Sequence, residues 1–162
     1  MKRLILSLVV AATATLSTHA QQVFLEIRDK AQATAADTHT AAMVRDINQF
    51  KVDALNYMAM KMKEQMPDSS AAFLDRQAYA MHSFISTYMK TLLAHRSDPQ
   101  KIQVEYMKLF IDASISNPLF NDNDHDVVLA YYTTADCLTR FSLDTDWQRA
   151  LLAVTTEMKK RR

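Results

Sequence analysis

The chain has 162 residues, of which 19 are basic and 18 acidic, with one cysteine and no glycine. The near-neutral charge gives no argument for binding nucleic acid, and a single cysteine excludes an internal disulfide framework. Phosphate-cradling loops and nucleophile elbows depend on glycine for their tight turns, so the composition points away from both and favours helices.

The first twenty residues have the pattern of a secretory signal peptide. A basic start at Lys2 and Arg3 precedes an apolar run over residues 4–16, and small residues lead up to Ala20. The run is too short to span a bilayer as a helix, and no later run is long and apolar enough to do so. We therefore expect cleavage after Ala20 and an exported mature domain over residues 21–162, periplasmic or extracellular, with 17 basic and 18 acidic residues.

The spacing of apolar residues predicts a helix over residues 22–33, a connector over 33–40 and a longer helix over 40–66 that Pro67 ends. The connector either breaks the first helical region or only bends it. Residues 71–96 form the most apolar segment, with no charged residue from Gln77 to Met89, so we place this helix at the centre of the fold.

A fourth helix follows Asp98 and Pro99 and ends at Asn117, and a short fifth helix covers residues 127–135. Asp144 and Asp146 are expected to cap a last helix that begins at Trp147. We find no repeat and no linker. The prediction is a single all-α domain, an antiparallel bundle of five or six helices.

Three segments resemble parts of small secreted bacterial proteins that are uncharacterised. They are residues 48–57 (NQFKVDALNY), 117–124 (NPLFNDND) and 141–147 (FSLDTDW). This resemblance implies export and an all-helical fold, and it implies no activity and no site residues.

Two sets of residues could hold a metal, and both have a simpler structural interpretation. Thioethers bind Cu(I), and the chain has a methionine row made up of Met58, Met60, Met62 and Met66. On a helix Met60 points away from the other three, and the same spacing is typical of a core stripe, so we favour packing. The second set, Asp122, Asp124 and Asp126, starts like a calcium loop but lacks its glycine and its final acid, so we favour a helix cap. We predict no cofactor and no metal site.

Catalytic candidates are few. His82 follows Asp75 by two helical turns and could be oriented by it as a general base, but a histidine satisfied within a helical core is the preferred interpretation. Cys137 is interpreted as a buried thiol, with an intermolecular disulfide as the alternative. Trp147 is expected to anchor the last helix to the bundle. We assign no catalytic, cofactor-binding or metal-binding residue.

Three functions stay open. The first is a non-enzymatic exported module that acts through protein contacts, with an unknown partner or by self-association. The second is a carrier of a small apolar ligand or soft metal, whose lining would include Met58, Met81, Phe84 and Tyr88. The third is a hydrolase with a site around His82 and Asp75. A contiguous exposed apolar patch favours the first function, a closed apolar cavity the second, and a polar cleft with a perturbed acid or histidine the third.

Overall fold

The computed structural model describes residues 22–120, 128 and 139–161. In this part of the chain the helices are α2 (Gln22–Ala36), α3 (Ala42–Gln65), α4 (Ala71–Ala94), α5 (Gln100–Ile115) and α8 (Trp147–Lys160). Within the same residues the β-structure amounts to one isolated bridge between Pro118 and Thr145. The predicted all-α fold is confirmed. The expected helix over residues 127–135 lies outside the described residues, apart from Val128, which is helical.

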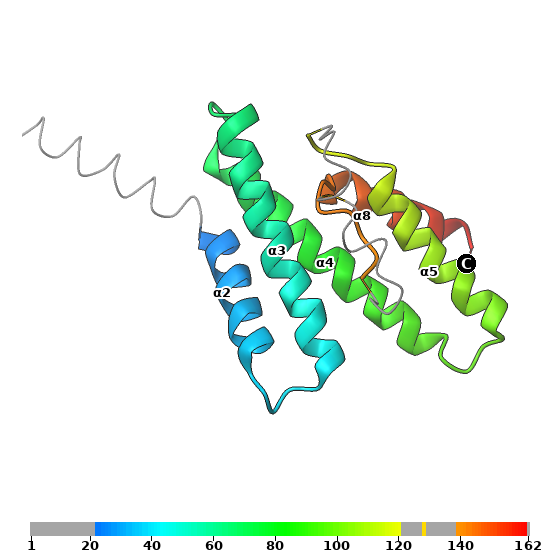
Figure 1. Cartoon of the computed structure of the whole chain (residues 1–162). Coiled ribbons are helices and arrows are strands. Elements are labelled where there is room, and N and C mark those ends of the chain that lie inside the picture. The colour runs from blue at the N-terminus through cyan, green and yellow to red at the C-terminus, as the bar shows by residue number, and fades with distance from the viewer. Residues whose placement is uncertain (1–21, 121–127, 129–138, 162) are drawn as a thin grey trace, which may run out of the picture.

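Helix α4 is central, as its composition predicts. It packs against all four of the other described helices, α2, α3, α5 and α8. In Figure 1, α2 and α3 lie side by side on one flank of α4, and α5 and α8 lie on the other. An apolar helix surface that extends around most of the circumference needs partners on several sides, and this arrangement supplies them.

Aromatic side chains from several helices meet at the middle of the molecule. Six of them are fully buried: Phe50, Tyr88, Phe84, Phe110, Phe141 and Trp147. Their ring centroids lie 5.1–6.4 Å apart, mostly edge to face, which is the preferred geometry for aromatic pairs. Trp147 contacts Phe50, Phe84 and Phe141 and anchors the start of α8, as predicted.

Polar side chains replace glycine in the turn between α2 and α3. The Asp37 carboxylate accepts hydrogen bonds from the backbone N–H of His39 at 2.9 Å and from the Thr40 hydroxyl at 2.8 Å. These bonds lower the pKa of Asp37, because they stabilise its charged form. Helix α2 continues to Ala36, beyond the predicted end at residue 33, so the connector is short and does break the helical region.

The segment before α8 is fixed by a buried polar cluster. The Asp144 carboxylate accepts hydrogen bonds from the backbone N–H of Leu119 at 3.2 Å and of Phe120 at 2.8 Å. Ser114 and Thr145 are joined through their hydroxyl oxygens at 2.7 Å. The expectation that Asp144 caps α8 is therefore wrong: Asp146 is the N-cap residue, and it accepts from the backbone N–H of Arg149.

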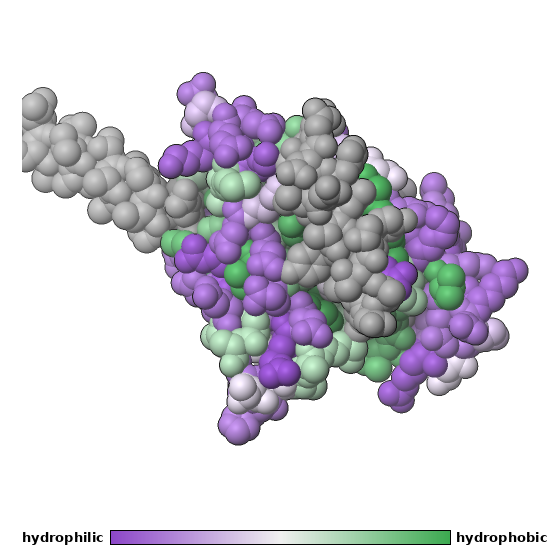
Figure 2. Space-filling view, viewed as in Figure 1, coloured by the Kyte–Doolittle hydropathy of each residue, from purple (hydrophilic) through white to green (hydrophobic). Residues whose placement is uncertain are grey.

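Most of the visible surface is polar. Hydrophilic residues line the outer edges of the face in Figure 2, and hydrophobic residues show mainly between them. Among the described residues, the helices are all too short or too polar to cross a bilayer. Some large apolar residues of the described helices are nevertheless exposed. Met43 is 48% exposed and Leu152 is 66% exposed.

Candidate functional site

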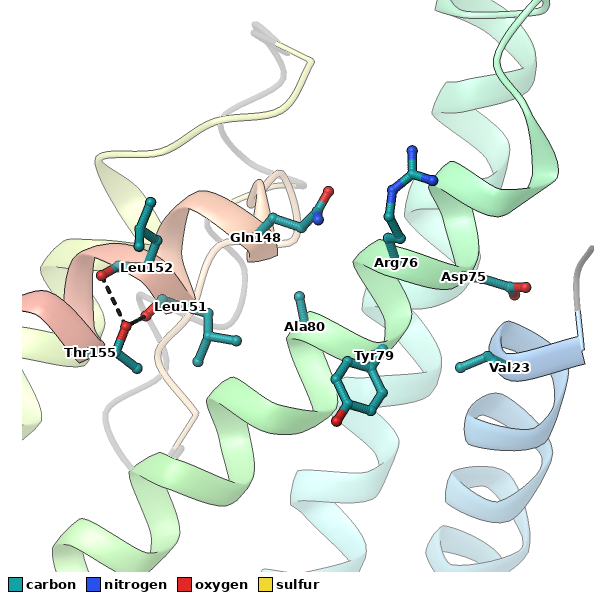
Figure 3. Close-up of a pocket in the computed structure, with 9 residues that line it drawn as sticks. All are labelled: Val23, Asp75, Arg76, Tyr79, Ala80, Gln148, Leu151, Leu152 and Thr155. Atoms are coloured by element: carbon teal, nitrogen blue, oxygen red, sulfur yellow. Dashed lines mark hydrogen bonds between the residues drawn. The ribbon is translucent and has the colours of Figure 1, made fainter.

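An open apolar groove lies between α4 and α8, and we call it the α4–α8 groove (Figure 3). Its volume is approximately 530 Å³. From α4 it is lined by Asp75, Arg76, Tyr79 and Ala80. From α8 it is lined by Gln148, Leu151, Leu152 and Thr155. Val23 at the start of α2 completes it. The groove has the size of a ligand or peptide site and it is not a closed cavity.

The walls of the groove carry large apolar side chains that the fold leaves in solvent. Tyr79 is 64% exposed and Leu152 is 66% exposed, whereas Ala80 on the floor is only 5% exposed. Figure 3 shows Ala80 between the two walls, with Leu151 directed toward it from α8. A small residue between larger ones makes a hollow that a side chain from outside can enter.

The carboxylate of Asp75 is used by the fold. Its Oδ1 accepts a hydrogen bond from the backbone N–H of Phe24 at 2.8 Å, in the first turn of α2. That N–H has no acceptor within its own helix, so Asp75 supplies a cap from a distant helix. In Figure 3 the carboxylate of Asp75 points toward α2, away from the space between α4 and α8.

The neighbouring arginine is placed differently. Arg76 lies over the ring of Phe73, with its guanidinium carbon 5.9 Å from the ring centroid, and it makes no ion pair with any described residue. Figure 3 places Arg76 and Gln148 at the same end of the groove. This end therefore presents a guanidinium and an amide beside an apolar floor.

The structure does not bring His82 and Asp75 together. His82 is exposed, so the interpretation of a histidine within the core is wrong. Partial desolvation and the positive charges of Lys51 and Lys30 lower the pKa of His82. Asp75 is hydrogen-bonded to α2, as described above, and no hydrogen bond between a described acid and His82 orients the imidazole.

The methionine row divides as helical geometry predicts. Met58 and Met62 are buried, at 1% and 7% exposure, and Met66 packs against the core. Met60 is 49% exposed and points away from them. Met58 and Met62 are core residues of α3.

The four side chains considered as a ligand lining are also core residues. Met58, Met81, Phe84 and Tyr88 are at most 1% exposed. The ring centroid of Phe84, for example, lies 5.2–5.5 Å from the ring centroids of Phe110, Phe141 and Trp147. Their surfaces are thus occupied by packing.

A second cluster joins the end of α8 to the turn between α4 and α5. The His95 ring stacks on the Tyr106 ring with centroids 4.0 Å apart. The guanidinium carbon of Arg161 lies 5.7 Å from the centroid of the Tyr106 ring. Nδ1 of His95 is 2.7 Å from Oδ2 of Asp98. Asp98 therefore interacts with His95, and Pro99 takes the N-cap position of α5.

Several predicted features lie outside the described residues, namely Asp122, Asp124, Asp126 and Cys137. In residues 22–120, 128 and 139–161, no three histidine, cysteine or acidic side chains gather as a metal site requires.

Sequence reasoning did not find the groove. Leu151 and Leu152 are adjacent, and the pattern alone does not tell which of them faces the core. The available signal was Tyr79, a large apolar residue one turn from Asp75 and Arg76 on α4.

We compared the chain with known protein families, curated proteins and solved structures. No family model, no curated protein and no solved structure matches this chain. The helical fold implied by the resemblance to small secreted proteins is confirmed, whereas export and bacterial origin stay predictions.

Proposed function

We propose that the protein is an exported, non-enzymatic helical module that acts through contacts with another protein, made at the α4–α8 groove. The observation that carries this proposal is the exposure of Tyr79 and Leu152, 64% and 66%, on opposite walls of one apolar groove. Large apolar side chains grouped around a concave surface are typical of interaction sites.

The core does not need these side chains. The aromatic cluster is complete without Tyr79, and α8 is already held by Trp147, Ala150 and Val154, each fully buried. Leaving Tyr79 and Leu152 in water contributes little to folding. Their exposure is therefore better explained by a contact that the isolated chain does not make.

The acids near the groove support a binding role over catalysis. Asp75 caps α2, and Asp146 caps α8 and accepts a hydrogen bond from the Gln77 side chain at 2.9 Å. Asp144 holds the backbone of Leu119 and Phe120. Each of these carboxylates stabilises the fold through a hydrogen bond that a catalytic role would disturb.

Site-specific photo-crosslinking in the producing host tests the proposal. A benzoylphenylalanine at position 79 or 152 is expected to form an adduct with one discrete protein, identified by peptide mass spectrometry. The purified partner should then bind the wild-type chain about tenfold or more tightly than the Leu152→Lys variant, because a central apolar contact is lost.

The matched control is position 93 on α4, where Leu93 is 62% exposed but does not line the groove. It should give no such adduct, and Leu93→Lys should bind the partner like the wild type. Adducts with equal yield at all three positions, or adducts with lipid alone, would contradict the proposal.

A further inference from the structure

We propose that the partner presents one acidic amphipathic helix, which lays its apolar face into the α4–α8 groove. This inference rests on the proposed function and names the chemistry of the partner. Three observations carry it: the cross-section of the groove, the small residue on its floor, and a cation at each end that forms no ion pair with a described residue.

The size of the groove fits the apolar face of a single helix. The α8 residues from Gln148 to Thr155 rise about 10.5 Å along the helix axis, or two turns. Dividing the volume of approximately 530 Å³ by this length gives a mean cross-section of about 50 Å². A helix with its side chains is about 10–12 Å across, so this cross-section holds about half of a helix. The groove thus accepts one face of a helix over two turns.

The shape of the lining suits side-chain insertion. Ala80 is a small floor residue, and Tyr79 and Leu152 stand on either side of it. An amphipathic helix places apolar side chains at i, i+3, i+4 and i+7, which is the spacing that fills such a row of hollows. Main-chain pairing with an extended peptide would instead need a free strand edge, and the groove is built from helices.

The charges at the rim favour an acidic partner. Arg76 lies at one end of the groove, and Lys159 lies one helical turn beyond Thr155 at the other. Neither is ion-paired to a described residue.

The nearby carboxylates are engaged within the chain. Asp75 accepts a hydrogen bond from the backbone N–H of Phe24. Asp146 accepts hydrogen bonds from the Gln77 side chain and from the backbone N–H of Arg149. Glu26 on α2 accepts a hydrogen bond from the Gln22 side chain at 2.8 Å. Hydrogen bonds from neutral donors leave these carboxylates charged, but the Asp75 carboxylate points toward α2 and away from the space between α4 and α8 (Figure 3). Arg76 and Lys159 are therefore the charges that we expect acidic residues beside the apolar face of the partner helix to meet.

The size of the lining disfavours a second copy of this chain. It is short of the 20–30 residues per side, roughly, that a stable dimer uses.

Peptide titrations test the inference. The protein is expressed from its full sequence, purified as the host leaves it, and titrated by fluorescence anisotropy. The acidic probe is a lactam-stapled helical peptide of about 14 residues with leucines at i, i+3, i+4 and i+7 and glutamates at both ends. The matched probe carries lysines in place of the glutamates. The acidic peptide is expected to bind about tenfold more tightly at low salt, with a difference that shrinks at about 0.5 M salt.

Variants locate the binding. Leu152→Lys should weaken the acidic peptide about tenfold, and Arg76→Glu about fivefold, mainly at low salt. Leu93→Lys should change nothing. Circular dichroism and the thermal midpoint of each variant establish that it is folded. Because Arg76 and Leu152 are exposed, we expect both variants to fold like the wild type.

Three results would overturn the inference. They are equal or tighter binding of the lysine peptide, an equal loss in Leu93→Lys, and displacement of the acidic peptide by oleate with saturable one-to-one binding of oleate. The photo-crosslinking experiment separates this inference from the proposed function. If the partner contacts the groove through a segment that is neither helical nor acidic, the inference fails and the proposed function stands. If no protein is crosslinked at positions 79 and 152, both fail.

Discussion

Asp144 stabilises the fold from a position where the sequence suggested a simple helix cap. It is 3% exposed, and its carboxylate accepts from the backbone N–H groups of Leu119 and Phe120. The local pattern of an acid before a helix is shared by Asp144 and Asp146, so the pattern alone does not tell which of them caps α8. Tertiary structure decides which acid caps α8, because residues 117–120 lie beside Asp144 and engage its carboxylate.

We predict that Asp144→Ala lowers the free energy of unfolding by about 2–3 kcal/mol, because it leaves a buried N–H without an acceptor. Asp146→Ala should cost about 1 kcal/mol, the usual value for a lost N-cap. Urea unfolding followed by circular dichroism measures both. Asp144→Asn retains an acceptor oxygen and should lie between the wild type and Asp144→Ala. An effect of Asp146→Ala that exceeds that of Asp144→Ala would refute this assignment.

His82 gives a prediction about pH. Desolvation and the charges of Lys51 and Lys30 lower its pKa in the folded state, so the unfolded state binds more protons near neutral pH. This group therefore makes no difference to stability above its ordinary pKa of about 6.5, and it lowers stability as the pH falls from there through the folded-state pKa. His82→Gln should remove this loss, so its stability relative to the wild type should rise between about pH 7 and pH 5.

NMR titration of the His82 ring checks the cause directly. Lys51→Met should raise the pKa of His82 toward its ordinary value, because it removes one of the two positive charges that lower this pKa. Exposed His39 provides the matched control, since His39→Gln should leave the pKa of His82 unchanged. If Lys51→Met left the His82 titration where it is, the electrostatic explanation would be wrong.

At the scale of the elements, the periodicity of the sequence predicted most of the described structure. The central position of α4 and the buried face of α3 follow from where apolar residues recur. The end of α2 was placed three residues too early, at 33 rather than 36, because Ala-Thr-Ala-Ala has no strong periodicity although alanine favours helix. Element ends are decided by such local balances and by capping contacts that periodicity does not contain.

The methionines of α3 test which face is buried. Met58→Ala should lower the free energy of unfolding by about 2–5 kcal/mol, because it opens a cavity in the core. Met60→Ala, only two residues away but 49% exposed, should change it by less than about 0.5 kcal/mol. Thermal or chemical unfolding measures both variants. Equal effects would mean that the face of α3 assigned to the core is wrong.

At the scale of the whole molecule, the fold class could be predicted and the candidate site could not. Helices and their apolar faces are local properties, whereas the α4–α8 groove depends on how α8 lies across α4. A helix cannot turn the neighbours Leu151 and Leu152 to the same side, and Leu151 is the one that packs against the core. Val23 joins the groove because α2 packs against α4, where Asp75 accepts a hydrogen bond from the backbone N–H of Phe24.

We propose that the groove binds another protein, so the isolated chain lacks one of its contacts. In this account the exposed Tyr79 and Leu152 contribute to binding and not to folding, so the purified chain carries no tightly bound small ligand and does not form a stable dimer. The cations at the rim favour a partner with acidic residues beside its apolar face.

Native mass spectrometry, with and without the acidic stapled peptide, tests whether the groove is a binding site for another protein. We expect the mass of a bare monomer for the chain alone and a one-to-one complex when the peptide is added, with much less complex for Leu152→Lys. A stable dimer that Leu152→Lys dissociates would instead assign the groove to a second copy. A constant small-molecule surplus on the purified chain would assign the groove to a carried ligand. Either result would show that the groove does not serve another protein.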